Sequence, residues 1–274
     1  MERRTTIGEV VAYLDATFRP ELQEDYDNAG FLLGDSVEKY TGALVALDLT
    51  PAVIDEAIGL GANLIVTHHP FIFSGLKRIT DRSESGRMVM ALVRNGISVY
   101  AAHTNLDNVP WGVSGVLAQK LKLMNCKVLK GVQGSAKECK GVQDDGIGAG
   151  IVGELTRVTK AGYFLLRVKR LLKQPTLRTS PFDPKKRIQR VALCGGSGAP
   201  FIGDAMAADA DIYITADLKY HDFQRGEGRI ILVDAGHYET EQFAKEIISH
   251  AISEKFSNFA CRISESQTSL VRYI

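Results

Sequence analysis

The 274-residue chain has little of what marks secreted, membrane or fibrous proteins. It contains no C-x-x-C pair, and its four cysteines are Cys126, Cys139, Cys194 and Cys261. This scatter argues against a disulfide framework or a structural zinc site and favours reduced thiols. No apolar run reaches about 18 residues, so no membrane-spanning helix is expected. The N-terminus, MERRTTIGEV, has no apolar run behind its charges and predicts no signal peptide. We therefore expect a cytoplasmic protein.

The chain also lacks a charge excess of either sign. Its 33 Lys and Arg residues nearly balance its 32 Asp and Glu residues, for a formal net charge of +1. Nothing at the level of the whole chain therefore indicates a nucleic acid or an anionic membrane as the partner. Hydrophobic residues make up 45% and charged residues 24%, as in ordinary globular proteins. The length allows one large core or two domains of ordinary size.

Helices and apolar strands alternate in the first half of the chain. Thr6 and Glu9 have capping-box spacing and begin one helix, and Thr50 with Pro51 begins another. Three strands are predicted at Ala43–Leu47, Leu64–Thr67 and Ile97–Ala102, with a helix at Arg87–Arg94 between the last two. This alternation indicates a mostly parallel sheet with helices on its faces.

The second half repeats this order. Strands are predicted at Arg190–Leu193, Asp211–Thr215 and Arg229–Asp234, and a short helix at Lys219–Phe223. The sequence VALD in the first half resembles VALC in the second, and both third strands are followed by a histidine with a carboxylate four residues later. The fold class is thus α/β, with two similar, duplicated domains.

We place the domain boundary between residues 128 and 129, so that the domains span 1–128 and 129–274. A Gly-rich stretch, Gly131–Gly150, is interpreted as the linker and the entry into the second domain. The last long helix, HYETEQFAKEIISHAI, begins in the second domain, and its C-terminal part can pack back on the first.

Basic residues gather between positions 167 and 190 with only Asp183 against them. They are Arg167, Lys169, Arg170, Lys173, Arg178, Lys185, Lys186, Arg187 and Arg190. A solvated helix face followed by a loop explains most such runs. The alternative is a local patch that attracts phosphorylated ligands.

Two adjacent histidines, His68 and His69, follow the second predicted strand, and Pro70 turns the chain away. Open α/β sheets bind ligands at this edge, where the loops after the strands converge. At a bend between strand and loop, the two imidazoles can splay toward two neighbouring metal ions. A chance surface or core pair is the competing interpretation.

His103 and Asp107 follow the third strand in the sequence AHTNLDNVPWG. Imidazole and carboxylate together suit zinc, manganese, iron or cobalt. Ordinary turn chemistry explains Asp107 equally well when it is taken alone.

His237 and Glu241 form the strongest pair. Residues four apart on a helix share a face, so an H-x-x-x-E pair can present both groups to one ion. The helix dipole explains a glutamate near a helix start but does not explain the histidine. Four of the six histidines thus follow strand ends at one predicted edge, and this ensemble predicts a metal site.

A glycine turn, CGGSGAP, follows the first strand of the second half. Such a turn can hold a phosphate on backbone N–H groups, but here it lacks the GK[ST] of a P-loop. Close packing between strand and helix is therefore the favoured role. Asn28 and Gly30 can line the same cleft, although turn formation also explains them.

These motifs together resemble the Nif-three-like family, whose members are often named GTP cyclohydrolase 1 type 2 homologues. The matching stretches are DNAGFLLGD, VTHHPFIF, AAHTNLDNVPWG, CGGSG with ADIYITADLKYHD, and VDAGHYETE. The resemblance implies two similar α/β domains, a dinuclear divalent metal centre and a ring-shaped homohexamer. Its metal ligands fall on His68, His69, Asp107, His237 and Glu241, with His103 beside them. The centre of the chain is too short for the extra domain that some members insert.

The sequence therefore predicts a dinuclear-metal hydrolase that acts on a small molecule, with a nucleotide as one candidate substrate. Under this hypothesis Glu241 bridges both ions. His69 and Asp107 also bind one ion, and His68 and His237 also bind the other. His103 carries protons, since histidine titrates near neutral pH. A metal-storage, metal-delivery or adaptor protein without turnover is the alternative, and whether the chain is an enzyme stays open at this point.

Overall fold

The structure is a computed structural model that describes residues 5–131, 146–266 and 268–273. Most of the predicted linker lies outside these residues. Contacts within the chain define two compact units: Met1–Leu106 with Ala244–Val271 form unit 1, and Asp107–Phe243 with Arg272–Ile274 form unit 2. These limits differ from the predicted boundary at 128/129, because that position falls inside a strand that pairs within the sheet of unit 2.

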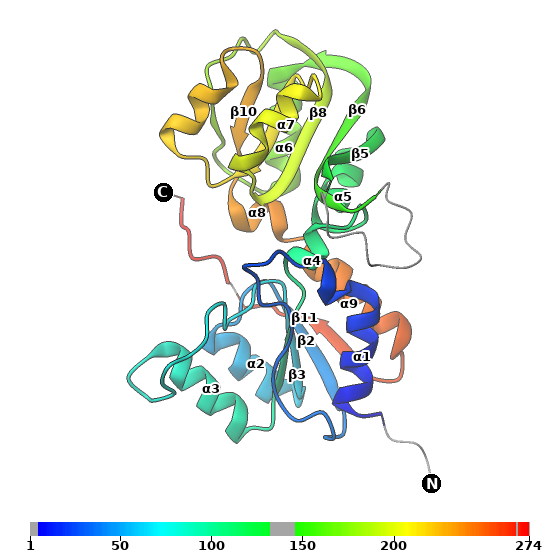
Figure 1. The fold of residues 1–274 in the computed structure, drawn as a ribbon, viewed down its shortest axis with the longest axis vertical. Helices are drawn as coiled ribbons and strands as arrows, with labels where there is room; N and C mark the ends of the chain where they lie inside the picture. Colours follow the sequence, from blue (N-terminus) through cyan, green and yellow to red (C-terminus); the bar gives the residue numbers. More distant parts are fainter. Residues whose placement is uncertain (1–4, 132–145, 267, 274) are drawn as a thin grey trace. The chain divides into compact units, whose positions relative to one another are not determined.

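Unit 1 is built on a five-stranded sheet (Figure 1). In spatial order its strands are β1 (Gly30–Leu33), β4 (Ser98–Ala101), β3 (Leu64–Thr67), β2 (Gly42–Ala46) and β11 (Ala260–Ile263). All neighbours are parallel except β1, which runs antiparallel to β4. The strands β2, β3 and β4 are completely buried, which explains why they appear in the sequence as continuous apolar runs.

Helices cover this sheet on both faces. They are α1 (Ile7–Phe18), α2 (Pro51–Leu60), α3 (Glu84–Arg94) and α9 (Ala244–Lys255), with a single turn, α4 (Thr104–Asp107), after β4. The capping box of Thr6 and Glu9 is present and confirms the predicted helix start. One core lies between the sheet and α2 and α3, while α9 contacts β2 and α1. The β2–α2–β3–α3–β4 order places three strand ends at one edge.

Unit 2 contains a six-stranded sheet of mixed direction. In spatial order its strands are β5 (Leu123–Gly131), β6 (Gly148–Lys160), β8 (Arg187–Ser197), β9 (Ile212–Ala216), β10 (Ile231–Asp234) and β7 (Arg178–Thr179). The predicted strands β8, β9 and β10 are parallel, whereas β5, β6 and β7 add antiparallel pairs at the two sides. Four neighbouring strands are parallel in unit 1 and three in unit 2, and both runs contain the three strands that the internal repeat predicts.

The helices of unit 2 also lie on both faces of its sheet. They are α5 (Val113–Lys120), η3 (Ala199–Phe201), α6 (Ala161–Leu172), α7 (Ile202–Ala207), η4 (Tyr220–Gly226) and α8 (His237–Glu241). One core contains side chains of α5 and α6, and the other contains side chains of α7 and η4.

The predicted last helix is two helices, α8 and α9, separated at Gln242 and Phe243. Phe243 packs into the core of unit 2, whereas the buried residues of α9, Ile248 and Ile252, belong to unit 1. The apolar residues on the two sides of this break pack in different units, and the prediction of a single helix is wrong. Among the residues that the structure describes, no helix is long and apolar enough to cross a bilayer.

Candidate metal centre

The histidines of unit 1 follow the carboxyl ends of neighbouring strands. β3 ends at Thr67, and the backbone N–H groups of His68 and His69 donate to the carbonyl oxygens of Ala46, the last residue of β2, and Leu47, at 3.3 and 3.0 Å. His103 follows β4 and begins the turn into α4. The parallel register of these strands therefore brings three imidazoles to one edge.

The three imidazoles lie against one another. Their ring centroids are 5.0 Å apart for His68 and His69, 5.3 Å for His68 and His103, and 5.5 Å for His69 and His103. One ring nitrogen from each lies within 4.8 Å of the other two, close enough to hold one metal ion. The fully buried His68 is therefore part of a cluster and not an isolated core histidine.

Each of these rings has an acceptor at Nδ1. His68 Nδ1 donates to the carbonyl oxygen of Ala102, His69 pairs with Asp48, and His103 pairs with Asp27, all at 2.7 Å. An acceptor at Nδ1 fixes the tautomer and the ring orientation and turns the Nε2 lone pair toward a cation. This arrangement is typical of metal-binding histidines.

Asp27 holds His103 most firmly. Its side chain is fully buried and also accepts from the backbone N–H of Thr104, at 3.0 Å, and from the Thr104 hydroxyl. Burial opposes ionisation, but the bonds from His103 and Thr104 outweigh it and lower the pKa of Asp27 to about 2. Asp27 therefore stays ionised and positions the imidazole.

Unit 2 brings together the other three predicted ligands. His237 Nε2 lies 2.9 Å from Glu241 Oε2, across one turn of α8. Carboxylate oxygens of Asp107 and Glu241 approach within 4.8 Å. Glu241 is almost completely buried, whereas the side chain of His237 is 38% exposed. The predicted i, i+4 geometry is confirmed.

His237 also has an acidic partner at Nδ1, since Asp217 Oδ2 lies 2.7 Å away. Burial disfavours the charged imidazolium, but the hydrogen bonds to Asp217 and Glu241 outweigh burial and raise the pKa of His237 to about 11. Without a metal, a proton therefore lies between His237 and Glu241. A cation binding there has to displace this proton.

The sequence predicts a glycine turn after the first strand of the second half, but Gly195 and Gly196 lie in the last part of β8, where its register with β9 is irregular, and Gly196 packs against Glu241. Gly196 has φ +60°, and a Cβ at this position would collide with Glu241 Oε1. The N–H of Gly195 donates to Ser114 Oγ at 3.2 Å, and that of Gly196 donates to Thr240 Oγ1 at 3.0 Å. These bonds occupy two N–H groups that a phosphate would need, so Gly195 and Gly196 serve close packing, the role favoured from the sequence.

The chain matches the model of one protein family, Duf34/NIF3 (NGG1p interacting factor 3), over residues 5–269. The chain belongs to this family. The resemblance seen in the motifs is therefore confirmed. Among its curated Duf34/NIF3 relatives is a GTP cyclohydrolase 1 type 2 homolog of Clostridium acetobutylicum, 37% identical over 223 residues, which are 80% of this chain and 79% of that protein. A protein of the same name from Nostoc is 36% identical, with 86% of this chain and 87% of that protein covered.

Solved structures share the whole fold of this Duf34/NIF3 protein. A Bacillus cereus protein related to NIF3 superposes with a TM-score of 0.88 at 22% identity, and both chains are covered completely. A Staphylococcus aureus protein superposes with a TM-score of 0.86 at 27% identity, with 99% of this chain and 100% of that one covered. The prediction of an α/β fold with two sheets flanked by helices is confirmed.

Three acids that orient the histidines of this Duf34/NIF3 protein were not predicted from the sequence: Asp27, Asp48 and Asp217. Two of these acids could have been predicted from their position in the sequence, because Asp48 and Asp217 each lie shortly after the end of a parallel strand, as the histidines do. Asp27 lies in a loop before β1 and carries no such signal. Its role follows only from its 2.7 Å approach to His103.

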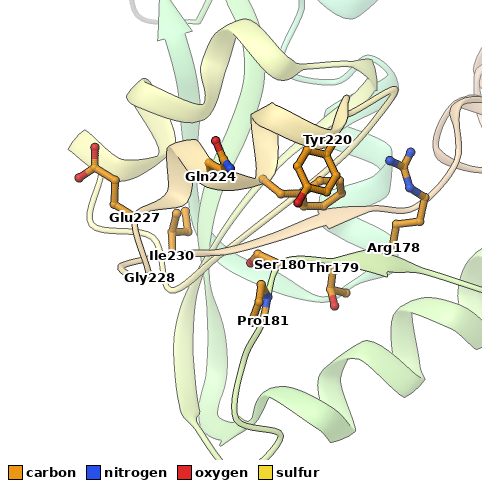
Figure 2. Close-up of a pocket in the computed structure, with 10 residues that line it drawn as sticks. Arg178, Thr179, Ser180, Pro181, Tyr220, Gln224, Glu227, Gly228 and Ile230 are labelled. Atoms are coloured by element: carbon orange, nitrogen blue, oxygen red, sulfur yellow. The ribbon is translucent and has the colours of Figure 1, made fainter.

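Some basic residues between 167 and 190 have partners within the protein. Arg167 donates to the carbonyl oxygen of Leu121, and Arg190 lies 3.7 Å from Glu154. Arg178 differs from these residues because it also lines a cavity between β7 and η4, which Figure 2 shows.

Cys194 lies beside the acids of unit 2 and is completely buried. Burial first, and then the nearby charges of Asp107 and Glu241, raise the pKa of its thiol to about 12. In the metal-free protein Cys194 is therefore a neutral packing residue. The described cysteines Cys126, Cys194 and Cys261 all carry free thiols.

Proposed function

We propose that this protein is a metal-dependent hydrolase whose centre holds two divalent ions, with zinc, manganese, iron and cobalt as the candidates. The observation that carries the proposal is the histidine cluster of unit 1, with an acceptor at every Nδ1. Packing in a hydrophobic core does not require three imidazole rings that converge in this way. The family's repeated name, GTP cyclohydrolase 1 type 2 homolog, is consistent with hydrolysis.

The predicted ligands have the chemistry that such ions require. His68 and His69 would supply neutral nitrogen donors, and Asp107, His237 and Glu241 would supply two carboxylates and a third imidazole. Two divalent ions, when bound, supply Lewis-acid polarisation and charge neutralisation in a hydrolytic displacement.

His103 is the proposed proton carrier. Its ring contacts His68 and His69, and Asp27 holds the proton of its Nδ1. Nε2 is then the atom that can take a proton from water or return one to a leaving group. Asp27 acts as the positioning residue, because it keeps the imidazole in one tautomer.

Two aromatic side chains beside this cluster favour a substrate with a flat ring. Phe73 lies 6.3 Å from His103 and 6.4 Å from Tyr26, measured between ring centroids. Both are exposed, Tyr26 by 66% and Phe73 by 48%. A bond from Asn28 Nδ2 to the carbonyl oxygen of Ile72 ties their loops together at 2.5 Å. A nucleobase can stack on such a surface.

The test combines metal content with turnover. Protein reconstituted with zinc, manganese or iron is analysed for metal per chain and then assayed for hydrolysis of nucleoside triphosphates and monophosphates. We expect two ions per chain and metal-dependent turnover, and His103→Gln should keep the metal but lose at least about 100-fold in kcat. Fewer than one ion per chain would contradict the metal centre.

Full metal occupancy without turnover would instead support metal storage or delivery. The exposed histidine His250 provides the matched control, since it lies on α9 at the surface and pairs only loosely with Glu254, at 3.8 Å. His250→Gln should change neither metal content nor kcat.

A further inference from the structure

A cavity of about 740 Å³ opens in unit 2 between the edge strand β7 and η4. Its wall is formed on one side by Thr179, Ser180 and Pro181, and on the other by Tyr220 and Phe223 of η4. Figure 2 shows Tyr220 opposite Ser180 and Thr179, with Arg178 and Glu227 at opposite ends. Cavities of a few hundred to about 1,000 Å³ are the usual size for small-molecule ligands.

Arg178 is held at one end of this cavity. Its Nη1 donates to Asp234 Oδ2 at 2.9 Å, and its guanidinium lies 5.3 Å from the centre of the Phe223 ring. Asp234 also accepts from the backbone N–H groups of Leu218 and Gly236, both at 3.1 Å. Asp234 therefore balances and orients Arg178, whose side chain is 58% exposed and keeps further N–H donors for a ligand. A guanidinium has five N–H donors in a planar fork, which suits a phosphate.

The opposite end is less attractive to an anion but offers an acceptor. Glu227 pairs with Arg229 at 2.8 Å, so its charge is balanced locally. Between the ends Tyr220 is 75% exposed. A large aromatic ring that stays exposed at the mouth of a cavity is a suitable stacking surface for a flat ligand.

We propose that this cavity binds a nucleoside monophosphate, with the phosphate on Arg178 and the base stacked on Tyr220. An amino group on the base would face the carboxylate of Glu227. The volume of the cavity favours a complete nucleotide over a smaller aromatic acid. Arg178 is then the one basic residue of the 167–190 segment to which we assign a role in binding. The site is separate from the proposed metal ligands and does not depend on their function.

Isothermal titration calorimetry with AMP as the probe tests the proposal, first on the metal-loaded protein and then after chelation. We expect saturable binding in both states. Adenosine lacks the phosphate and ribose phosphate lacks the base, so each should bind at least about tenfold more weakly. Tyr220→Ala should weaken AMP binding at least about tenfold, and so should Arg178→Gln.

Matched variants separate these effects from general damage. Tyr163 on α6 is a second exposed tyrosine of unit 2, at 66%, and Arg170 is an exposed basic residue of the same segment. Tyr163→Ala and Arg170→Gln should leave AMP affinity unchanged, and far-UV circular dichroism should match wild type for all four variants.

Three outcomes would overturn the proposal. The first is the absence of saturable AMP binding to the wild-type protein. The second is AMP affinity that is unchanged in both Tyr220→Ala and Arg178→Gln. The third is AMP binding that disappears on chelation and is insensitive to Tyr220→Ala, because that result places the nucleotide on the metal ligands. If the hydrolase proposal failed, AMP binding to the wild-type protein and its loss in Tyr220→Ala and Arg178→Gln could still be measured and would still decide this proposal.

Discussion

The first prediction compares two of the proposed ligands, Glu241 and His69, which differ in how many metal ions one side chain can bind. A carboxylate has two oxygens and can bind two cations, whereas an imidazole gives one nitrogen to one ion. Glu241→Gln keeps the shape of the side chain but removes the charge that offsets both ions. We expect it to lose both metals, while His69→Ala keeps at least one partly occupied.

Metal analysis of both variants beside wild type checks this prediction. The fold should survive in each, because the ligands lie in loops and in a short helix and are not members of the hydrophobic cores of the two units. If Glu241→Gln retained two metals at near wild-type affinity, the assignment of the bridge would be wrong. Asp107 would then be the better candidate.

The proton between His237 and Glu241 makes metal affinity depend on pH. The pKa of His237 rises from 6.5 to about 11 in the metal-free fold, so a metal competes with this proton at any pH below about 11. We expect apparent affinity to increase as pH rises toward about 11, with proton release on binding. Titrating zinc in buffers of different ionisation enthalpy measures the released protons.

The same pair stabilises the metal-free fold in a predictable direction. Because the folded pKa lies above the unfolded value, this contribution is complete below about pH 6.5 and is lost as pH rises through about 11. Asp217→Asn removes one acceptor and should lower the pKa of His237. A proton release in that variant equal to wild type would contradict the assignment.

At the scale of the element, the glycines at the end of β8 set how closely α8 approaches the sheet. Gly196 adopts φ +60°, and any Cβ there would meet Glu241 Oε1. Gly196→Ala should therefore displace Glu241 and reduce metal content to at most one ion per chain. It should also destabilise the fold by about 1–3 kcal/mol, from backbone strain and overpacking.

Gly203 provides the control for this element. It lies in α7, and a Cβ at its position has no heavy atom within 4 Å. Gly203→Ala should keep wild-type metal content and be neutral or slightly stabilising in thermal melts. Equal metal loss in Gly196→Ala and Gly203→Ala would show that Gly196 does not position Glu241.

At the scale of the whole molecule, we propose a homohexamer, which rests on the family resemblance. Light scattering in dilute buffer should report about six times the chain mass of 30.0 kDa. A monomer at the same concentration would contradict the proposal. Measuring Glu241→Gln in parallel shows whether assembly requires the metals.

Much of each unit could be predicted from the sequence. The buried parallel strands appear as short apolar runs, the helix starts carry caps, and the internal repeat indicates two similar α/β units. The strand-end histidines were likewise visible, because parallel strands deliver their following residues to one edge. These features are local or depend only on chain order.

Other features were decided only by the tertiary structure. The single long helix after β10 is divided because Phe243 and Ile248 belong to different cores, which no helical period reveals. Asp27 orients His103 across 76 positions of the chain, and the cavity beside Arg178 joins residues 178–181 to residues 220–230. Sequence patterns report which face of an element is apolar, whereas contacts between distant segments depend on how those faces pack together.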